Sequence, residues 1–263
     1  MTGRLAGRSI LITRPAGQAE RLAARILAAG GEAILYSAIE IAPPANPRSL
    51  ESILDRLERF QIAIFISPTA VAKGHAAVVA RRAWPGALRL AAVGEGTAAA
   101  LAALGFQVVV APAGRGDSEA LAALPELADV RGKSIVIFRG EGGRETLRRE
   151  LEARGASVEY AECYRRVRPT ADPTALIARW AQAGIDAVFI TSTEGLENLV
   201  AILGEKGAAH LRATPAFVPH PRVAEAARKF GIGKTLVVSP GDDALVEALA
   251  SFFATVRPAA DHH

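Results

Sequence analysis

Two kinds of segment recur in this sequence at an interval of about half its length. Gly7–Arg14 (GRSILITR) is echoed by Gly132–Arg139 (GKSIVIFR), and Phe65–Ser67 (FIS) is echoed by Phe189–Thr191 (FIT). Segments in the order A, B, A′, B′ over so long a period indicate two similar α/β units rather than a solenoid of short repeats. Two such units would face each other across a cleft, which is where small-molecule sites tend to lie.

Short apolar runs alternate with helical stretches through both halves of the chain. The runs that we expect to be strands are Ile10–Thr13, Ile62–Ile66, Leu88–Val93, Phe106–Val110, Ser134–Phe138, Ala187–Ile190, Ala216–Val218 and Thr235–Val238. The stretches that we expect to be helices are Gln18–Ala29, one beginning at Pro47, Thr69–Arg82, Thr97–Leu104, Ser118–Leu124, Arg144–Arg154, Pro173–Ala183, Leu196–Leu203, Val223–Phe230 and Ala244–Ala254. Strands that alternate with helices of this length predict an α/β protein, with parallel sheets covered by helices on both faces.

Two extended stretches interrupt this alternation at equivalent places after the A and A′ helices. They are Glu32–Pro44 and Ser157–Pro169, and both end in proline. We expect them to connect the two units, so that each unit combines an A segment with a B segment from the other half. The predicted domains are 1–35 with 170–258, and 45–156, with linker strands at 36–44 and 157–169 and a disordered tail at 259–263.

The amino-acid composition and charge argue against a membrane-spanning, secreted or nucleic-acid-binding protein. Half of the 263 residues are hydrophobic, but no apolar run is long enough to span a membrane, and the N-terminus has no signal-peptide pattern. The lone cysteine, Cys163, excludes an intramolecular disulfide and suits a reducing compartment, so we expect a cytoplasmic protein. The net charge of +4 is not gathered into a basic block, so we expect no nucleic acid partner. This charge fits a polyanionic small molecule as well as it fits nucleic acid, but an ordinary solvated surface is the favoured interpretation.

The motifs of the common enzyme classes are absent from the sequence. There is no HExxH, CxxC, P-loop or GxSxG motif, and Gly140–Gly143, although it follows a strand, lacks the GxGxxG spacing of a nucleotide site. The five histidines lack the spacing of metal ligands. We therefore expect neither a metal nor a nucleotide cofactor.

Small polar residues recur where the expected strands end and helices begin. They lie in four turns, Ser67–Thr69, Gly94–Thr97, Thr191–Thr193 and Pro219–Arg222. Each turn alone could be an ordinary helix N-cap. In doubly wound sheets, however, ligands bind outside the carboxyl ends of the strands, where helix N-termini attract anions. Four such turns on the same edges of two sheets favour an anion-binding site.

An ordered set of motifs resembles the uroporphyrinogen-III synthase family over nearly the whole chain. The motifs are Ile10–Pro15 (ILITRP), Phe65–Val71 (FISPTAV), Ala92–Ala98 (AVGEGTA), Phe138–Arg144 (FRGEGGR), Tyr164-Arg165 followed by Pro169, and Phe189–Leu199 (FITSTEGLENL). The resemblance implies two flavodoxin-like parallel-sheet domains joined by a two-stranded linker, with pseudo-repeat halves.

The resemblance also implies an activity. The chain would be a monomeric, cofactor-free lyase of tetrapyrrole biosynthesis, on the route to haem or a related macrocycle. It would remove water from hydroxymethylbilane, an octacarboxylate linear tetrapyrrole, invert ring D through a spiro intermediate and close uroporphyrinogen III. Transient contact with the hydroxymethylbilane synthase that supplies the substrate is implied too. Holding one conformation of a flexible polyanion is a problem of orientation, which explains why the usual catalytic motifs are missing.

Individual roles follow from the same resemblance. Tyr164 matches the family's linker tyrosine and is the expected proton donor, although a phenol with a pKa of about 10 is a weak acid. The expected substrate-binding residues are Arg14, Ser67, Thr69, Gly94, Thr97, Arg139, Gly140, Thr191, Ser192, Thr193 and His220. His220 departs from the family pattern, so it could contact substrate or merely fill a glycine position.

Two other functions stay open on the sequence alone. The first is a two-domain protein that binds an anionic small molecule without catalysis. The second is a nucleotide-dependent α/β enzyme, which the missing phosphate fingerprint disfavours. Product formation separates the synthase from the binder, and nucleotide binding would favour the third function.

Overall fold

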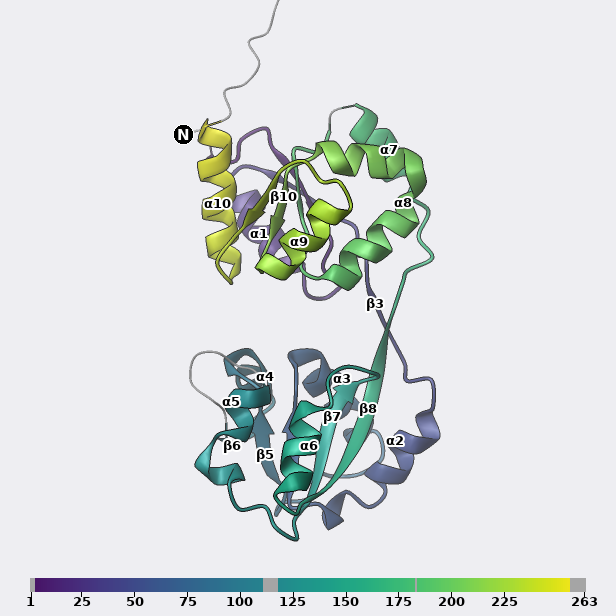
Figure 1. Cartoon of the computed structure of the whole chain (residues 1–263), viewed down its shortest axis with the longest axis vertical. Coiled ribbons are helices and arrows are strands. Elements are labelled where there is room, and N and C mark those ends of the chain that lie inside the picture. Colours follow the sequence, from purple (N-terminus) through teal and green to yellow (C-terminus); the bar gives the residue numbers. More distant parts are fainter. Residues whose placement is uncertain (1–2, 111–117, 183, 256–263) are drawn as a thin grey trace, which may run out of the picture. The chain divides into compact units, whose positions relative to one another are not determined.

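The structure is a computed structural model that describes residues 3–110, 118–182 and 184–255. The chain divides into two compact units, which are shown in Figure 1. We call Met1–Glu40 with Val167–His263 the first unit, and Ile41–Arg166 the second unit. The divisions fall within 36–44 and 157–169, the segments expected to be linkers. The expected tail, 259–263, lies outside the described residues.

The first unit is a parallel sheet with helices on both faces. Its strands are β1 (Ser9–Ile12), β2 (Glu32–Leu35), β9 (Ala187–Phe189), β10 (Ala216–Val218) and β11 (Thr235–Val237), in the order β11-β10-β9-β1-β2. Its helices are α1 (Glu20–Ala28), α7 (Thr174–Ala181), α8 (Thr193–Ala213), α9 (Pro221–Lys229) and α10 (Asp242–Thr255). Residues of α1 and α10 pack with one set of strand side chains, including Ile10 and Ile12. Residues of α7, α8 and α9 pack with the alternate set, including Leu11.

The second unit has the same construction. Its strands are β3 (Glu40–Ala42), β4 (Ile62–Phe65), β5 (Arg89–Ala92), β6 (Val108–Val110), β7 (Ser134–Gly140) and β8 (Ser157–Val167), in the order β3-β8-β7-β4-β5-β6. Its helices are α2 (Pro47–Leu54), α3 (Pro68–Val79), α4 (Glu95–Ala103), α5 (Ser118–Ala122) and α6 (Thr146–Ala153), with 3₁₀ turns η1 (Leu57–Arg59) and η2 (Pro125–Leu127). Helices α2, α3 and α4 cover one face, and α5 and α6 cover the other.

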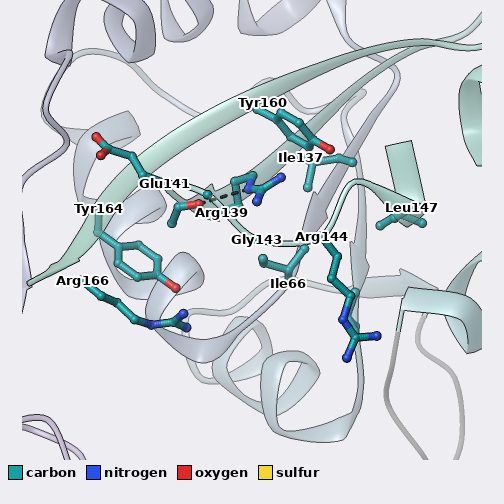
Figure 2. Close-up of a pocket in the computed structure, with 13 residues that line it drawn as sticks. Ile66, Ile137, Arg139, Glu141, Gly143, Arg144, Leu147, Tyr160, Tyr164 and Arg166 are labelled. Carbon is teal, nitrogen blue, oxygen red and sulfur yellow. Dashed lines mark hydrogen bonds between the residues drawn. The ribbon is translucent and has the colours of Figure 1, made fainter. Parts of the chain in front are cut away.

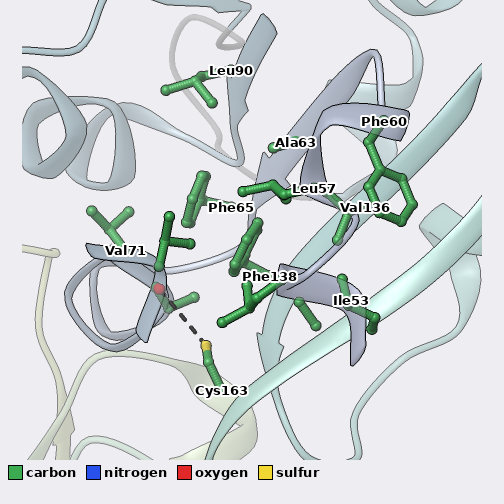
Figure 3. Close-up of a cluster of buried hydrophobic side chains, with 14 of the residues drawn as sticks. Ile53, Leu57, Phe60, Ala63, Phe65, Val71, Leu90, Val136, Phe138 and Cys163 are labelled. Carbon is green, nitrogen blue, oxygen red and sulfur yellow. Dashed lines mark hydrogen bonds between the residues drawn. The ribbon is translucent and has the colours of Figure 1, made fainter. Parts of the chain in front are cut away.

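The core under α2, α3 and α4 is built around aromatic rings (Figure 3). Phe65 of β4 and Phe138 of β7 stack at 4.6 Å between ring centroids. The two strands are parallel neighbours in register, so these residues lie side by side on one face of the sheet. Gly74 of α3 comes so close that an added Cβ would lie 2.6 Å from the Phe138 ring. A side chain at this position would push α3 off the sheet.

The two sheets follow one pattern. The first sheet, read as β2-β1-β9-β10-β11, has the order 2-1-3-4-5 of flavodoxin-like folds. The second sheet, read as β8-β7-β4-β5-β6, has the same spatial arrangement in a circularly permuted chain order, because β7 and β8 follow β4, β5 and β6 in the sequence. The strands β1 and β7 correspond to each other, as do β9 and β4, and these are the strands that carry the repeated sequence segments. The expected α/β fold with parallel sheets and pseudo-repeat halves is therefore confirmed.

Several expected elements differ in detail from the structure. The stretches 32–44 and 157–169 are more than connections, because β2 and β8 are full members of the two sheets. Strand β8 belongs there because Val158, Ala161 and Cys163 are buried in the cores of the second unit. The helix expected at 196–203 is longer, since a second helical piece follows a break at Gly204, where φ is +61°.

Capping residues predict the helix starts well. Asn46 accepts a hydrogen bond from the Ser49 amide at 3.4 Å at the start of α2, as expected. Asp172 accepts one from the Thr174 amide at 2.9 Å, although α7 begins at Thr174, one residue later than Pro173. A shift of one residue is within the ordinary uncertainty of a helix end.

Candidate active site

A pocket lies at the carboxyl edge of the sheet of the second unit. Strand β4 leads through α3 to β5 on one side, whereas its neighbour β7 leads through α6 to β8 on the other. Parallel strands whose connections diverge in this way leave a crevice beyond their carboxyl ends, the usual ligand site of an open α/β sheet. The pocket has a volume of about 270 Å³, and all its walls come from the second unit (Figure 2).

The walls of the pocket have an apolar and a polar part. The apolar residues are Ile66, Val93, Ile137 and Leu147, and the polar part comprises residues 139–144, Tyr160, Tyr164 and Arg166. Three of the predicted site residues, Arg139, Gly140 and Tyr164, therefore line one cavity.

Tyr164 is held in place by its contact with Gly140. The ring is 1% exposed, and a Cβ added to Gly140 would lie 2.7 Å from its Cε2 atom. The Tyr164 hydroxyl is 3.3 Å from the Ser67 Oγ. The backbone carbonyl of Tyr164 accepts a hydrogen bond from the Glu141 amide at 2.8 Å. Only a glycine at position 140 leaves room for the ring in this place.

An irregularity in strand β8 sets the direction of the Tyr164 ring. Arg139 pairs with Glu162 and Gly140 with Tyr164, so Cys163 is an extra residue in β8. Adjacent residues of a regular strand point to opposite faces, but a bulge breaks this alternation. Cys163 and Tyr164 are both buried in the same core as a result.

Cys163 is a structural part of this bulge. Its Sγ donates a weak hydrogen bond to the Arg139 carbonyl at 3.3 Å, and a longer contact joins it to the Ala70 carbonyl (Figure 3). Burial raises the pKa of the thiol to about 12, so the thiol stays protonated and is unsuited to act as a nucleophile.

Arg139 is a buried cation in the pocket wall. Its side chain is 3% exposed, and its Cζ lies 4.3 Å from the centroid of the Tyr160 ring. The Nε donates to the Gly140 carbonyl at 3.0 Å, and Nη1 lies 3.6 Å from Oε1 of Glu145. A guanidinium fixed in this way can offer its remaining donors to a carboxylate.

A family model described as uroporphyrinogen-III synthase HemD matches residues 20–247. The chain belongs to the uroporphyrinogen-III synthase family. The uroporphyrinogen-III synthase of Salmonella typhimurium is 36% identical over 244 residues, which cover 92% of this chain and 99% of the relative. That of Escherichia coli is 34% identical over the same shares of the two chains. Enzymes of this family cyclise hydroxymethylbilane and belong to the lyases.

Solved structures of the family share the fold. A variant of the uroporphyrinogen III synthase of Thermus thermophilus is 17% identical, with a TM-score of 0.60 over 94% of this chain and 98% of that chain. The uroporphyrinogen-III synthetase of Helicobacter pylori 26695 is 14% identical, with a TM-score of 0.58 over 95% of this chain and 100% of that chain. At these identities the likeness shows the fold alone.

The other synthase residues predicted in the second unit lie in the turns after β4 and β5. Ser67 caps α3 by accepting from the Ala70 amide at 3.1 Å, and it contacts the Tyr164 hydroxyl as well. Thr69 follows in the first turn of α3. Gly94 opens α4 with a φ of +90°, and Thr97 is buried with its hydroxyl donating to the Val93 carbonyl at 3.3 Å.

The synthase residues predicted in the first unit lie at the corresponding edge of its sheet. Arg14 follows β1, and Thr191, Ser192 and Thr193 follow β9, the neighbouring strand. Ser192 caps α8 by accepting from the Gly195 amide at 3.0 Å. His220 precedes α9, is exposed and makes no capping hydrogen bond.

Arg14 differs from its repeat partner Arg139 in having a carboxylate within hydrogen-bond distance. Its Nη1 donates to Asp242 at 2.7 Å, and Arg21 donates to the same carboxylate at 2.8 Å. Burial disfavours the charged form of Asp242, but the hydrogen bonds from Arg21 and Arg14 outweigh it and lower the pKa. The guanidinium of Arg14 is therefore held by a carboxylate that it shares with Arg21.

Of the thirteen residues that line the pocket, sequence reasoning identified only Arg139, Gly140 and Tyr164, and the residues that it missed include Gly143, Tyr160 and Arg166. The sequence pattern places Tyr160 and Arg166 only in a connecting stretch, and Gly143 only in an imperfect nucleotide motif. Strand alternation could not have grouped Tyr160 with Tyr164 and Arg166, because the bulge at Cys163 lies between them. Nothing in the described residues forms a group of three or more His, Cys, Asp or Glu side chains fit for a metal. None of the helices in the described ranges could cross a membrane.

Proposed function

We propose that this chain removes water from hydroxymethylbilane and closes it, with inversion of ring D, to uroporphyrinogen III. The observation that carries the proposal is the family match, which extends over 92% of this chain at 36% identity to the Salmonella typhimurium enzyme. The pocket at the carboxyl edge of the second unit supports it, because a cationic wall and a tyrosine hydroxyl suit a carboxylate-rich substrate that loses a hydroxyl group.

Tyr164 is the proposed proton donor. The phenol gives its proton to the departing hydroxyl group of the substrate, which leaves as water as the electron-rich pyrrole supplies the electron pair. A phenol is a weak acid, but pyrroles expel this group with modest help, so position matters more than acidity. The Gly140 surface and the Ser67 hydroxyl supply that position.

The substrate carboxylates have several proposed partners. In the second unit these are Arg139 and the turns at Ser67, Thr69, Gly94, Thr97 and Gly140, and in the first unit Arg14, Thr191, Ser192, Thr193 and His220. A hydrogen bond to a charged group contributes about 1.5–3 kcal/mol, so a few such bonds suffice to select one folded conformation of the chain of pyrroles. Preferring ring inversion over direct closure requires about 1.4 kcal/mol for each factor of ten.

The proposal extends to the setting of the enzyme. We expect a cytoplasmic monomer that works without cofactor or metal and meets hydroxymethylbilane synthase transiently, since its substrate is reactive.

Analysis of the product isomers tests the proposed function. Hydroxymethylbilane is generated in situ by purified deaminase, this protein is added, and the oxidised uroporphyrins are separated by chromatography. A shift from isomer I to isomer III establishes the reaction. Isomer I alone, from protein shown to be folded by circular dichroism, would refute it and favour a non-catalytic binder of an anionic molecule.

A further inference from the structure

The pocket of the second unit is too small for a whole linear tetrapyrrole. Its volume of about 270 Å³ is below the roughly 300–1,000 Å³ of pockets that enclose a drug-sized ligand. A volume below this range suits a part of the substrate, such as one pyrrole ring with its two acid arms, better than all four rings together.

The walls match such a ring in chemistry as well as in size. Ile66, Val93 and Ile137 supply apolar surface that suits the flat face of a pyrrole, and Arg139 and Arg166 supply positive charge. Both arginines are drawn among the lining residues in Figure 2. The one acidic side chain among the lining residues is Glu141, and its carboxylate accepts a hydrogen bond from the Ala45 amide. The lining therefore combines apolar surface with more positive than negative charge.

Arg139 can serve as a fixed carboxylate clamp because three groups hold it. The centroid of the Tyr160 ring lies 4.3 Å from its Cζ, the Gly140 carbonyl accepts from its Nε, and Glu145 lies 3.6 Å from its Nη1. Burial raises the pKa of Tyr160 more than the charge of Arg139 lowers it, so Tyr160 remains a neutral phenol. A neutral ring stabilises the cation without competing for its charge.

Gly143 leaves space for the head of this clamp. An added Cβ would lie 2.8 Å from the Nη2 of Arg139, and the backbone has a φ of +97°, which side chains other than glycine rarely adopt. The turn that closes the pocket is thus shaped around the guanidinium of Arg139.

We propose that this pocket binds one pyrrole ring of the substrate by its acetate and propionate arms, and that Tyr160 is a positioning residue that aims Arg139 at a carboxylate. The inference rests on the proposed function, because that function supplies the substrate. It assigns a ring subsite to the second unit and a role to Tyr160, Gly143 and Arg166.

Kinetics of Tyr160 variants test the positioning role. Tyr160→Leu removes the ring face and is expected to raise KM for hydroxymethylbilane roughly tenfold, with kcat much less affected, because the clamp acts on substrate binding. Tyr160→Phe keeps the ring and should recover most of the loss in KM. Arg149→Met, which removes an exposed arginine of α6 outside the pocket walls, is the matched control.

An unchanged KM in folded Tyr160→Leu overturns the role of Tyr160. If that variant does not fold, Arg139→Lys, which lacks the fork and the bond to Gly140, must raise KM instead.

Binding of a single pyrrole tests the subsite without turnover. The probe is a monopyrrole with one acetate and one propionate arm, and its dimethyl ester is the uncharged control. In nuclear magnetic resonance spectra of the wild-type protein, the diacid should shift the amide resonances of Gly142 and Gly143. It should bind more weakly to Tyr160→Leu. Neither the dimethyl ester nor salt should displace the diacid at equal concentration. Failure of the diacid to bind at millimolar concentration, in protein that makes isomer III, overturns the subsite. Binding of the diacid by protein that makes only isomer I supports the dicarboxylate subsite and refutes the proposed function alone.

Discussion

Replacing Gly140 with alanine should displace the Tyr164 ring while leaving the backbone unstrained. The added Cβ would lie 2.7 Å from Cε2 and 2.8 Å from Cζ of Tyr164, and φ at Gly140 is not in the left-handed region. Carbon atoms in contact prefer about 3.5–4.0 Å, so the ring must retreat by roughly 1 Å. Such a retreat would separate the hydroxyl from its partner Ser67, which is 3.3 Å away.

The expected effects are large enough to measure separately. Overpacking of this kind costs about 1–3 kcal/mol of unfolding free energy, measured by urea denaturation. A misplacement of about 1 Å costs up to roughly 10²-fold in rate, so kcat for isomer III should fall by that order. Gly86→Ala is the matched control, since an added Cβ there meets no atom within 4 Å. It should leave both quantities close to those of the wild-type protein.

A double-mutant cycle decides whether Gly140 acts through the tyrosine hydroxyl. Tyr164→Phe alone is expected to lower kcat about 10²-fold, because it removes a general acid. Adding Gly140→Ala to Tyr164→Phe should then cost little more in kcat, although the ring clash and the loss of stability remain. If Gly140→Ala reduces kcat as much in the Tyr164→Phe background as in the wild type, the reasoning is refuted.

Three further outcomes are expected. Ser67→Ala and Asn46→Ala should each lose about 1 kcal/mol of unfolding free energy in urea, because each removes a helix cap, but only Ser67→Ala should also lower kcat; equal kcat values would limit Ser67 to capping. Asp242→Asn should lose about 2 kcal/mol at neutral pH in urea titrations. Because the pKa of Asp242 is lowered in the folded protein, this carboxylate stabilises the fold above the ordinary aspartate pKa of about 4. That stabilisation is lost as the pH falls through the lowered pKa. A stability difference between Asp242→Asn and wild type that persists unchanged at pH 2 would contradict this account. Cys163, with a pKa of about 12, should resist iodoacetamide at pH 8 until urea unfolds the protein, as followed by mass spectrometry; rapid alkylation of folded protein would count against its burial.

Much of the fold could be predicted because both halves of the sequence carry the same pattern of strands and helices. The A strands and their glycine-ended helices recur with the same apolar spacing, and the strands β1, β4, β7 and β9 lie within a residue or two of the expected positions. The role of the extended stretches was harder to predict. A strand such as β8, which is buried at Val158 and Ala161 but exposed at Arg165, has the mixed pattern of a connection.

The site could be predicted only as residue types at strand ends. The pairing of Tyr164 with Gly140 depends on a bulge at Cys163, and no local pattern marks where one strand gains a residue over its neighbour. The contact between Arg139 and the Tyr160 ring joins residues of β7 and β8 and depends on how these two strands are aligned. Periodicity identifies which face a residue prefers, but contacts between strands follow from their alignment.

The repeat makes the difference between the two arginines informative. Arg14 and Arg139 end equivalent strands of equivalent sheets, so the fold alone gives them the same place. Arg14 shares the close carboxylate of Asp242 with Arg21, whereas Arg139 has the more distant carboxylate of Glu145 and a neutral ring, and it lines a cavity. The 3.6 Å ion pair of Arg139 with Glu145 is longer than a hydrogen bond, whereas Arg14 is hydrogen-bonded to Asp242 at 2.7 Å. Arg139 therefore keeps donors for a further anion, which is what a site for a carboxylate ligand requires.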